Sequence, residues 1–464
     1  MRLRPVLLAC LAAAGLAAPA RAQPDVRADG FTRLYGALRA DPATAPSDAD
    51  YLALLGRSEL GLRADYDRGG VRLRLRADVD GLAPYSEEDA DADTPGAGRL
   101  DLRLVEAYAD VFFDRVDLRV GRQVLAWGET DGAFITDLLA PLDLTRFLAQ
   151  DAADLRLGLT AVRATAYLGD VTADVVLVPR AAPSVLPARR SPWDPIPTDV
   201  LGVRVELESP ELPSPTLGHG EAALRLTWAG LDQTDLALIL FTGHNRLPAF
   251  DKRLRASFAE GLRAVLTPVY RRRQVVGLTA ETARLEPFVL RAEAAYTSAE
   301  LLDEALDLPS PLTPAALFDP DLAAAAGRGF LLEKPAVQAA FGAERFFGKH
   351  LVRLTGLGHA VLQWDARVAE RRFTPSVSAL YAAPFRRETV QVRAFALIGL
   401  EGDYWLNPSA AYTVSDGLVV TLGAHVFGGR GGADGDAALL DEPSFSFGLY
   451  DRNDLVFLQL QYGF

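Results

Sequence analysis

Cysteine and methionine are almost absent from this chain, and their absence excludes two kinds of site. The only cysteine, Cys10, and the only methionine, Met1, both lie within the first 22 residues. Once that segment is removed, the remaining chain forms neither a disulfide nor a thiolate metal site.

The first 22 residues have the three parts of a secretory signal peptide. Arg2 and Arg4 precede an apolar run and a small-x-small cleavage motif that ends at Ala22. The alternative is a lipoprotein box ending at Cys10, but it comes early and the apolar run continues past it. We expect Sec-type cleavage near Ala22, which leaves residues 23–464 as the mature chain.

A positive net charge and long apolar runs are also missing. The formal charge is −13, and cleavage removes three arginines but no acids, which leaves about −16. This charge argues against general affinity for nucleic acid. No later segment has 18 or more consecutive apolar residues, so the sequence predicts no transmembrane helix. The mature chain is long enough for several soluble domains or for one large barrel.

Alternation with a period of two is what the chain has in abundance. From Val71 to Val79, apolar residues at odd positions alternate with charged ones. This pattern is typical of a β-strand with one apolar face. About eighteen such segments of roughly ten residues are present, which is the length of a tilted strand that crosses a bilayer. They begin near residues 31, 52, 70, 99, 115, 154, 171, 220, 234, 271, 287, 335, 349, 371, 387, 403, 417 and 452.

The links between these segments alternate in length. Links after even-numbered segments are short, whereas most links after odd-numbered segments, such as 179–219, 244–270 and 299–334, are long and polar. This alternation is typical of an up-and-down barrel with one rim in the periplasm and the other outside. The sequence therefore predicts an all-β fold, a transmembrane antiparallel up-and-down β-barrel of about 18 strands (range 16–18). An extra strand-like segment, 203–207, would break the parity, and we assign it to the 179–219 link.

A secreted soluble sandwich or propeller is the alternative fold, because its strands also alternate. The asymmetry of the links disfavours it. So does the confinement of two acidic clusters, at 86–91 and 434–442, to long links.

The C-terminal segment carries a further signal of a barrel. A barrel has no free edge, so its last strand pairs with its first. Apolar residues of one parity would face lipid, with aromatic rings at the interface. The pattern resembles the C-terminal signal of bacterial outer-membrane proteins that the barrel-assembly machinery reads. Its five positions are Val456, Leu458, Leu460, Tyr462 and Phe464.

This signal defines the expected surroundings of the protein. We expect it in the outer membrane of a Gram-negative bacterium, in contact with outer-membrane lipid and lipopolysaccharide. During biogenesis its partners would be the barrel-assembly machinery and periplasmic chaperones. We expect no nucleic-acid partner.

One long link, residues 121–153, is too apolar for a freely solvated loop and should bury that surface. We expect it to fold into the barrel and to narrow the pore as a constriction loop. The alternative is an external cap packed on neighbouring links. The candidate constriction residues are Arg122, Trp127, Glu129, Asp131, Asp137, Asp143 and Arg146.

The same link carries a family resemblance. GRQ-x3-WG-x2-DG followed by D-x3-P-x-D resembles a stretch of poorly characterised, porin-like Gram-negative outer-membrane β-barrel proteins. Barrels of the alginate-export type are more distantly similar. The resemblance implies an outer-membrane barrel and a channel, and it supplies no solute. The matching residues are Gly121, Arg122, Trp127, Gly128, Asp131, Gly132, Asp137, Pro141 and Asp143.

In each strand, the residues that alternate with the lipid-facing ones should line the lumen. Rings of charged side chains select ions, and the guanidinium fork matches carboxylates and phosphates, so a preference for anions is one hypothesis. In the other hypothesis, arginine and acid residues pair across strands and stabilise the wall, and the 45 arginines against three lysines reflect coding bias. The candidate pore-lining residues are Arg72, Arg74, Arg76, Asp78, Asp117, Arg119, Arg291, Glu293 and Arg393.

Motifs for catalysis are missing. None of the five histidines lies in a nucleophile-elbow or zinc-binding spacing, and there is no phosphate loop, dinucleotide fingerprint or calcium loop. We expect no catalytic residues, no metal and no cofactor. The expected function is passive or substrate-biased passage of small hydrophilic solutes, with anions among the candidates. The alternatives are a polysaccharide-export barrel and a structural or adhesive barrel with a plugged lumen.

Overall fold

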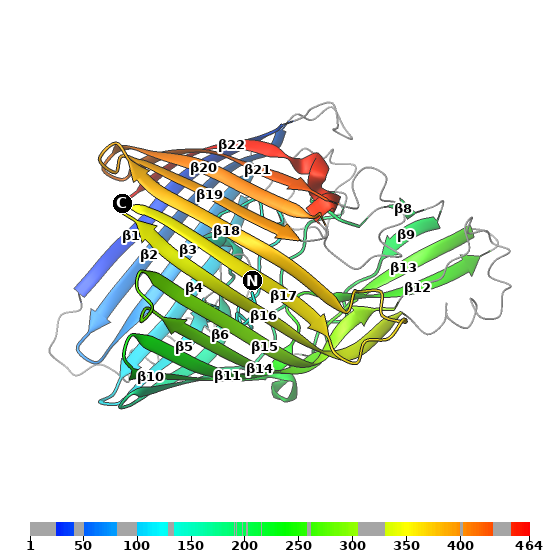
Figure 1. Ribbon diagram of the computed structural model, residues 1–464, viewed down its shortest axis with the longest axis horizontal. Helices are drawn as coiled ribbons and strands as arrows, with labels where there is room; N and C mark the ends of the chain where they lie inside the picture. Colours follow the sequence, from blue (N-terminus) through cyan, green and yellow to red (C-terminus); the bar gives the residue numbers. More distant parts are fainter. Residues whose placement is uncertain are drawn as a thin grey trace.

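The computed structural model is a closed antiparallel β-barrel of 18 strands (Figure 1). Strand β1 pairs with both β2 and β22, so the sheet has no free edge. A closed ring is what lipid requires, because an open edge would leave backbone groups without hydrogen bonds. The prediction of a transmembrane antiparallel up-and-down barrel is confirmed, and the strand count lies at the upper end of the expected range.

The structure describes the greater part of the chain. Among these residues, no helix is both long and apolar enough to cross a membrane. The predicted signal peptide and the two acidic clusters lie outside them. The described ranges are 25–40, 51–80, 100–128, 134–189, 191, 193–196, 198–200, 203–214, 216–257, 261–304, 330–399, 402–429 and 447–464.

The wall strands run in chain order around the ring, each paired with its neighbours. They are β1 (Asp25–Arg39), β2 (Tyr51–Tyr66), β3 (Gly69–Asp80), β4 (Leu100–Phe112), β5 (Val116–Gln123), β6 (Leu159–Leu168), β7 (Val171–Val178), β10 (Glu221–Leu231), β11 (Thr234–His244), β14 (Arg272–Thr282), β15 (Phe288–Asp303), β16 (Leu331–Phe347), β17 (His350–Val361), β18 (Phe373–Phe385), β19 (Val390–Gly399), β20 (Tyr404–Ser415), β21 (Leu418–Gly428) and β22 (Leu455–Gly463).

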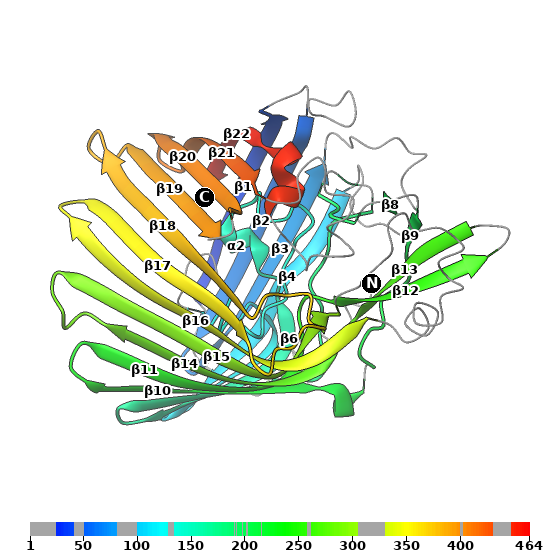
Figure 2. The same ribbon diagram turned by 45° about the vertical axis from the view of Figure 1, so that its right-hand side comes forward.

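A second, four-stranded sheet projects from one rim of the barrel (Figures 1 and 2). It consists of β8 (Asp199–Val200), β9 (Val203–Leu207), β12 (Ala249–Ser257) and β13 (Gly261–Val269). The assignment of 203–207 to a link outside the wall is confirmed. The description of 244–270 as a polar loop was wrong, because β12 and β13 form a hairpin there with buried apolar side chains.

Each predicted strand corresponds to one wall strand, although several boundaries differ. The sixth was expected from residue 154, but β6 begins at Leu159. Leu155 and Leu157 continue the alternation of β6, yet residues 152–155 form the short helix α2 (Ala152–Leu155). Among the described residues, the other helical elements are 3₁₀ turns, η2 (Leu217–His219) and η5 (Phe447–Asn453).

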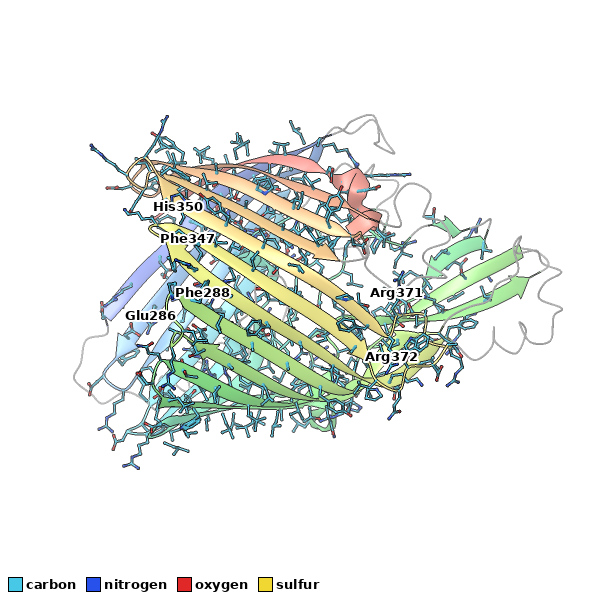
Figure 3. All side chains as sticks on the ribbon, in the orientation of Figure 1. Glu286, Phe288, Phe347, His350, Arg371 and Arg372 are labelled. Atoms are coloured by element: carbon cyan, nitrogen blue, oxygen red, sulfur yellow. The ribbon has the colours of Figure 1, made fainter. Side chains whose placement is uncertain are left out.

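The two rims of the barrel differ as the link lengths predicted. Figure 3 shows Glu286, Phe288 and His350, which lie beside short links, at one end of the strands. Arg371 and Arg372 lie at the other end, from which the second sheet projects. We call these the short-link rim and the long-link rim.

The outer face of the wall is apolar. The five apolar residues of the C-terminal segment have exposed fractions of 40–61% and point outward. On the opposite face of β22, Leu455 and Phe457 are buried inside the barrel. An exposed apolar band around a closed barrel is the surface that faces lipid.

A β-bulge in β4 occurs where the alternation of the sequence slips. Arg74 pairs with Glu106 and Leu75 with Leu104, so Val105 has no partner of its own. The extra residue changes the parity of the strand. Arg103 and Glu106 therefore both face the lumen, although their numbers have opposite parity.

Candidate functional site in the barrel lumen

The described residues between β5 and β6, 124–128 and 134–158, lie inside the barrel, and we call residues 124–158 the inward segment. Figure 2 shows its helix α2 inside the ring of strands. Its first half packs on the wall through Leu125, Trp127, Ile135 and Leu138, which form one apolar cluster with side chains of β6, β7, β10, β11, β14, β15 and β16. The apolar residues that made this link unlike a solvated loop are therefore buried against the inner wall.

A glycine in the wall lets the inward segment approach closely. Thr136 is fully buried, and its Cγ2 atom lies 3.3 Å from where a Cβ would stand on Gly277 of β14. A side chain at that position would push the segment away from the wall.

The second half of the inward segment packs on the opposite side of the ring. Phe147 and Ala149 belong to a cluster with side chains of β1, β2, β21, β22 and η5. The ring of Phe147 stacks on Tyr450 with 4.0 Å between centroids. In the ring, β22 and β1 stand opposite β11 and β14. The inward segment therefore crosses the lumen from one wall to the other.

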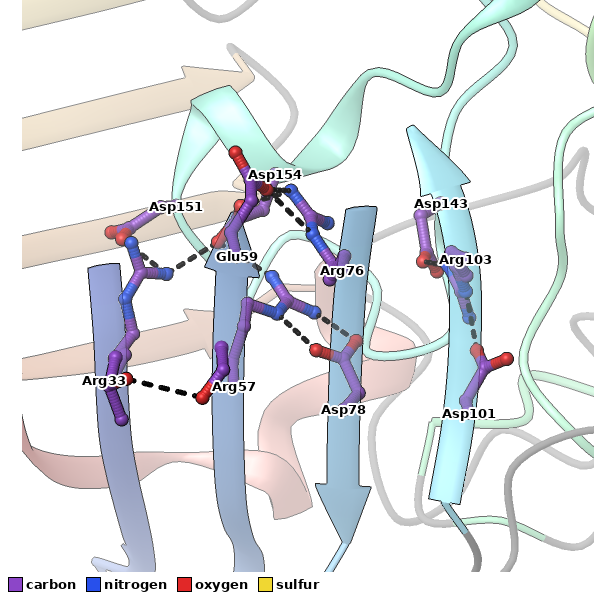
Figure 4. Close-up of polar contacts among 12 residues, drawn as sticks. Arg33, Arg57, Glu59, Arg76, Asp78, Asp101, Arg103, Asp143, Asp151 and Asp154 are labelled. Carbon is purple, nitrogen blue, oxygen red and sulfur yellow. Dashed lines mark hydrogen bonds and ion pairs between the residues drawn. The ribbon is translucent and has the colours of Figure 1, made fainter. Parts of the chain in front are cut away.

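An ionic cluster fixes the end of the inward segment (Figure 4). The buried carboxylate of Asp154 in α2 lies 2.5 Å from Arg33, 2.8 Å from Arg57 and 3.0 Å from Arg76, on β1, β2 and β3. Burial alone would raise the pKa of Asp154, but the three guanidinium groups outweigh it and lower the pKa below its usual range.

The predicted constriction residues are held by further polar contacts. Asp143 forms an ion pair with Arg103 and accepts a hydrogen bond from the Thr145 hydroxyl. Burial opposes ionisation of Asp143, but Arg103 and Thr145 lower its pKa. Asp137 lies 2.6 Å from Arg156. These contacts neutralise the negative charges of Asp143 and Asp137, two acidic residues that we expected in the constriction.

The remaining predicted constriction residues have different surroundings. Arg122 donates to the Leu104 carbonyl at 2.7 Å, and Trp127 is buried in the apolar cluster. Arg146 lines a small cavity of about 20 Å³ beside Asp154. Glu129 and Asp131 lie outside the residues that the structure describes.

A second segment between β7 and β10 also enters the barrel, and the sequence did not predict it. The Leu144 amide donates to the Val185 carbonyl, and the Val185 amide donates to the Leu142 carbonyl, each at 2.8 Å. Trp193 joins the cluster around Phe147. The available signal was a group of large apolar residues, including Val185 and Trp193, within a proline-rich link.

The predicted pore-lining arginines carry partners. Arg72 lies 3.5 Å from Glu106, Arg74 lies 3.3 Å from Glu59, and Arg76 lies 3.0 Å from Glu59. These pairs join neighbouring wall strands, as the hypothesis of wall stabilisation expects.

The other predicted pore-lining residues are also paired or buried. Asp78 forms an ion pair with Arg57, Arg119 with Asp110, and Arg291 with Glu281 and Glu344. Asp117 accepts a hydrogen bond from the Tyr167 hydroxyl, and Arg393 donates to Asn407. Glu293 is buried, with an exposed fraction of 2%.

Comparison with known proteins supports the assignment as a barrel but does not indicate an activity. Residues 3–392 match a family described as "Protein of unknown function (DUF1302)". No curated protein matches the chain. The match to a family without an assigned function, on a closed barrel, confirms the resemblance drawn from the motif in 121–143.

Several solved structures are similar in fold. Acinetobacter baumannii OccAB4 has a TM-score of 0.51 and 11% identity, over 96% of this chain and 99% of that chain. A. baumannii OccAB1 has a TM-score of 0.51 and 9% identity, over 95% and 96%. Pseudomonas aeruginosa OccK8 (OprE) has a TM-score of 0.50 and 10% identity, over 95% and 98%. At these identities the similarity establishes the fold alone.

Proposed function

This chain belongs to the DUF1302 family, whose description assigns no activity, and we propose that it is an outer-membrane channel for small hydrophilic solutes. The observation that carries the proposal is the inward segment, which crosses the lumen and is anchored on both walls. A barrel of this width encloses an aqueous lumen unless segments fill it. The inward segment, with the β7–β10 link packed against it, would divide that lumen into narrow passages, which suits small solutes and excludes polymers.

The inner wall supports this proposal because it is polar beside an apolar outer face. Charged side chains of β2, β3, β5 and β15 point into the lumen, and most pair with neighbours. Paired charges keep the wall hydrated without a strong net field. We therefore propose a channel of modest ion selectivity.

Single-channel recording tests the proposal. We expect the refolded protein in a planar bilayer to give discrete current steps, and a salt gradient gives the sign of its selectivity. Silence from a correctly folded, heat-modifiable barrel would contradict the channel. It would instead support a structural barrel with a plugged lumen, the second candidate, which the anchoring of the inward segment on both walls also favours.

Reversing two wall charges should change the ion selectivity. In Arg72→Glu with Arg74→Glu, Glu106 loses both of its arginine partners, Glu59 keeps only Arg76, and the net charge of the lumen becomes more negative by four units. We expect the reversal potential in a salt gradient to move towards the value of a cation-selective channel. The control is Arg345→Glu, because Arg345 lies over Phe288 and Phe347 on the outer face. An unchanged potential would mean that Arg72 and Arg74 do not line the conducting path.

We propose that the C-terminal strand face is the signal for assembly into the outer membrane. The backbone of Phe464 exchanges two hydrogen bonds with Gly30, each 3.0 Å, beyond the last ladder pairs of β22. Phe464→Asp should reduce the amount of heat-modifiable barrel in outer-membrane fractions several-fold. Phe347→Asp is the control, because Phe347 is also an exposed outer aromatic near the short-link rim. Equal losses from both variants would indicate lost lipid contact and would count against a signal.

A further inference from the structure

A cavity of about 370 Å³ lies between the inward segment and the wall. Phe134 and Leu138 of the inward segment line one side, and Arg273 of β14 and Glu370 of the β17–β18 link also line the cavity. Glu370 immediately precedes Arg371, which Figure 3 places at the long-link rim. The volume is in the range of sites for small molecules. The cavity therefore lies beside the inward segment, with part of its lining next to the long-link rim.

Arg273 differs from the two other arginines that line the cavity. Arg246 lies 2.7 Å from Glu221, and Arg271 lies 3.5 Å from Glu211. Within the described part of the chain, the side chain of Arg273 makes no ion pair or hydrogen bond, although Glu300 attracts its charge at longer range, and its Nε atom is buried without a partner. A guanidinium group without partners in a protein interior is available to an anion, and such charge-assisted bonds are strong.

Glu370 has the opposite charge, and one of its carboxylate oxygens also lacks a hydrogen-bond partner. Its Oε1 atom accepts from the Asp303 amide at 3.0 Å, whereas its Oε2 atom is buried without a partner. Burial raises the pKa of Glu370 to about 7, so a cationic donor nearby would stabilise its ionised form.

The neighbouring carboxylates of the cavity are already paired. Asp303 lies 2.9 Å from Lys252, and Glu300 lies 3.2 Å from His359. Glu370 is therefore the carboxylate of this cavity that is open to a ligand, as Arg273 is the open arginine.

The rest of the lining is largely apolar, with Leu247, Phe250 and Leu301 beside Phe134 and Leu138. We propose that this cavity is a binding site for small zwitterions with an aliphatic body, whose carboxylate binds Arg273 and whose ammonium binds Glu370. This inference rests on the proposed channel function, and it names the class of solute that the channel takes. A simple anion would leave the Glu370 carboxylate without a partner, and a simple cation would leave Arg273 without one.

The test uses three small-molecule probes that share a similar branched aliphatic chain and differ in their charged groups. L-leucine carries both charges, 4-methylpentanoate lacks the ammonium group, and 3-methylbutylamine lacks the carboxylate. Binding to the refolded full chain in detergent is measured at pH 8 by ligand-observed NMR titration. We expect leucine to bind most tightly, and we expect Arg273→Gln and Glu370→Gln each to weaken it about tenfold or more. Glu370→Gln should leave 4-methylpentanoate unaffected, and Arg273→Gln should leave 3-methylbutylamine unaffected.

Two matched controls make the same change of charge at positions outside the cavity. Arg345→Gln lies on the outer wall, and Glu388→Gln lies in a short link, where Glu388 is exposed and pairs with Lys349. Both should bind leucine like the unmodified chain. Each variant is first checked for the heat-dependent gel shift of a folded barrel.

The outcomes separate this inference from the channel proposal. Equal binding of leucine and 4-methylpentanoate, with no effect of Glu370→Gln, would overturn the zwitterion site in favour of an anion site. No saturable binding of any probe would overturn the site altogether, even if the protein conducts ions. Saturable leucine binding that both variants weaken would support the site, even if the protein is silent in a bilayer and the channel proposal fails.

Discussion

Replacing residues 124–158 by Asn-Gly should raise the single-channel conductance at least about twofold, because the inward segment no longer crosses the lumen. The replacement suits the barrel because Gln123 and Leu159 are directly paired, and Asn-Gly forms a tight two-residue hairpin turn. Each wall strand would keep its own register. The measurement is conductance in a planar bilayer, with the heat-dependent gel shift as the check on folding.

The same replacement distinguishes a constriction from an external cap. A folded variant with unchanged conductance would show that the inward segment does not limit the ion path. If the intact protein is silent and the variant conducts, the segment is a plug, and the structural barrel with a blocked lumen becomes the better interpretation.

Asp154→Asn should destabilise the protein by about 3–5 kcal/mol, because breaking a buried ion pair leaves uncompensated charge. Here Arg33, Arg57 and Arg76 would all lose the carboxylate that they share. The measurement is the free energy of unfolding from urea titration of the refolded barrel. Asp25→Asn is the control, because Asp25 and Arg27 form an exposed pair and we expect no measurable change from its loss.

The effect of Asp154→Asn should depend on pH in one direction. The folded-state pKa of Asp154 is lowered, so its contribution to stability is fully present above the unfolded value of about 4. That contribution falls as the pH decreases through the lowered pKa of the folded state. The unmodified chain should therefore lose more stability on acidification than Asp154→Asn does. Equal free energies of unfolding for the two proteins above pH 5 would contradict the role of this cluster.

The wall of the barrel was predictable from sequence because lipid imposes a simple rule on it. Every strand shows one apolar face to the membrane, so the alternation from Val71 to Val79 and its repeats identify the strands without knowledge of their neighbours. The rule fails where apolar residues face something other than lipid. Leu155 and Leu157 continue the alternation of β6 but lie in the inward segment, which is why the sixth strand was expected too early.

The partners of the charged residues were not predictable in the same way. Parity places Arg76 on the inner face, but its pairing with Glu59 depends on the register between β2 and β3. Its second partner, Asp154, lies 78 residues away and reaches it only because the inward segment folds back. Arg273 on β14 and Glu370 in the β17–β18 link line one cavity, and the conformation of that link has no period in the sequence.

The contacts of the inward segment join strands from both ends of the chain, which bears on how the barrel assembles. The arginines that bind Asp154 belong to β1, β2 and β3, which precede the segment in the chain. The aromatic partners of Phe147 belong to β21 and η5, close to the C-terminus. The segment can therefore dock on the first strands early, but its second anchor forms only when the last strands arrive. We therefore expect the interior of the lumen to be complete only when the ring closes.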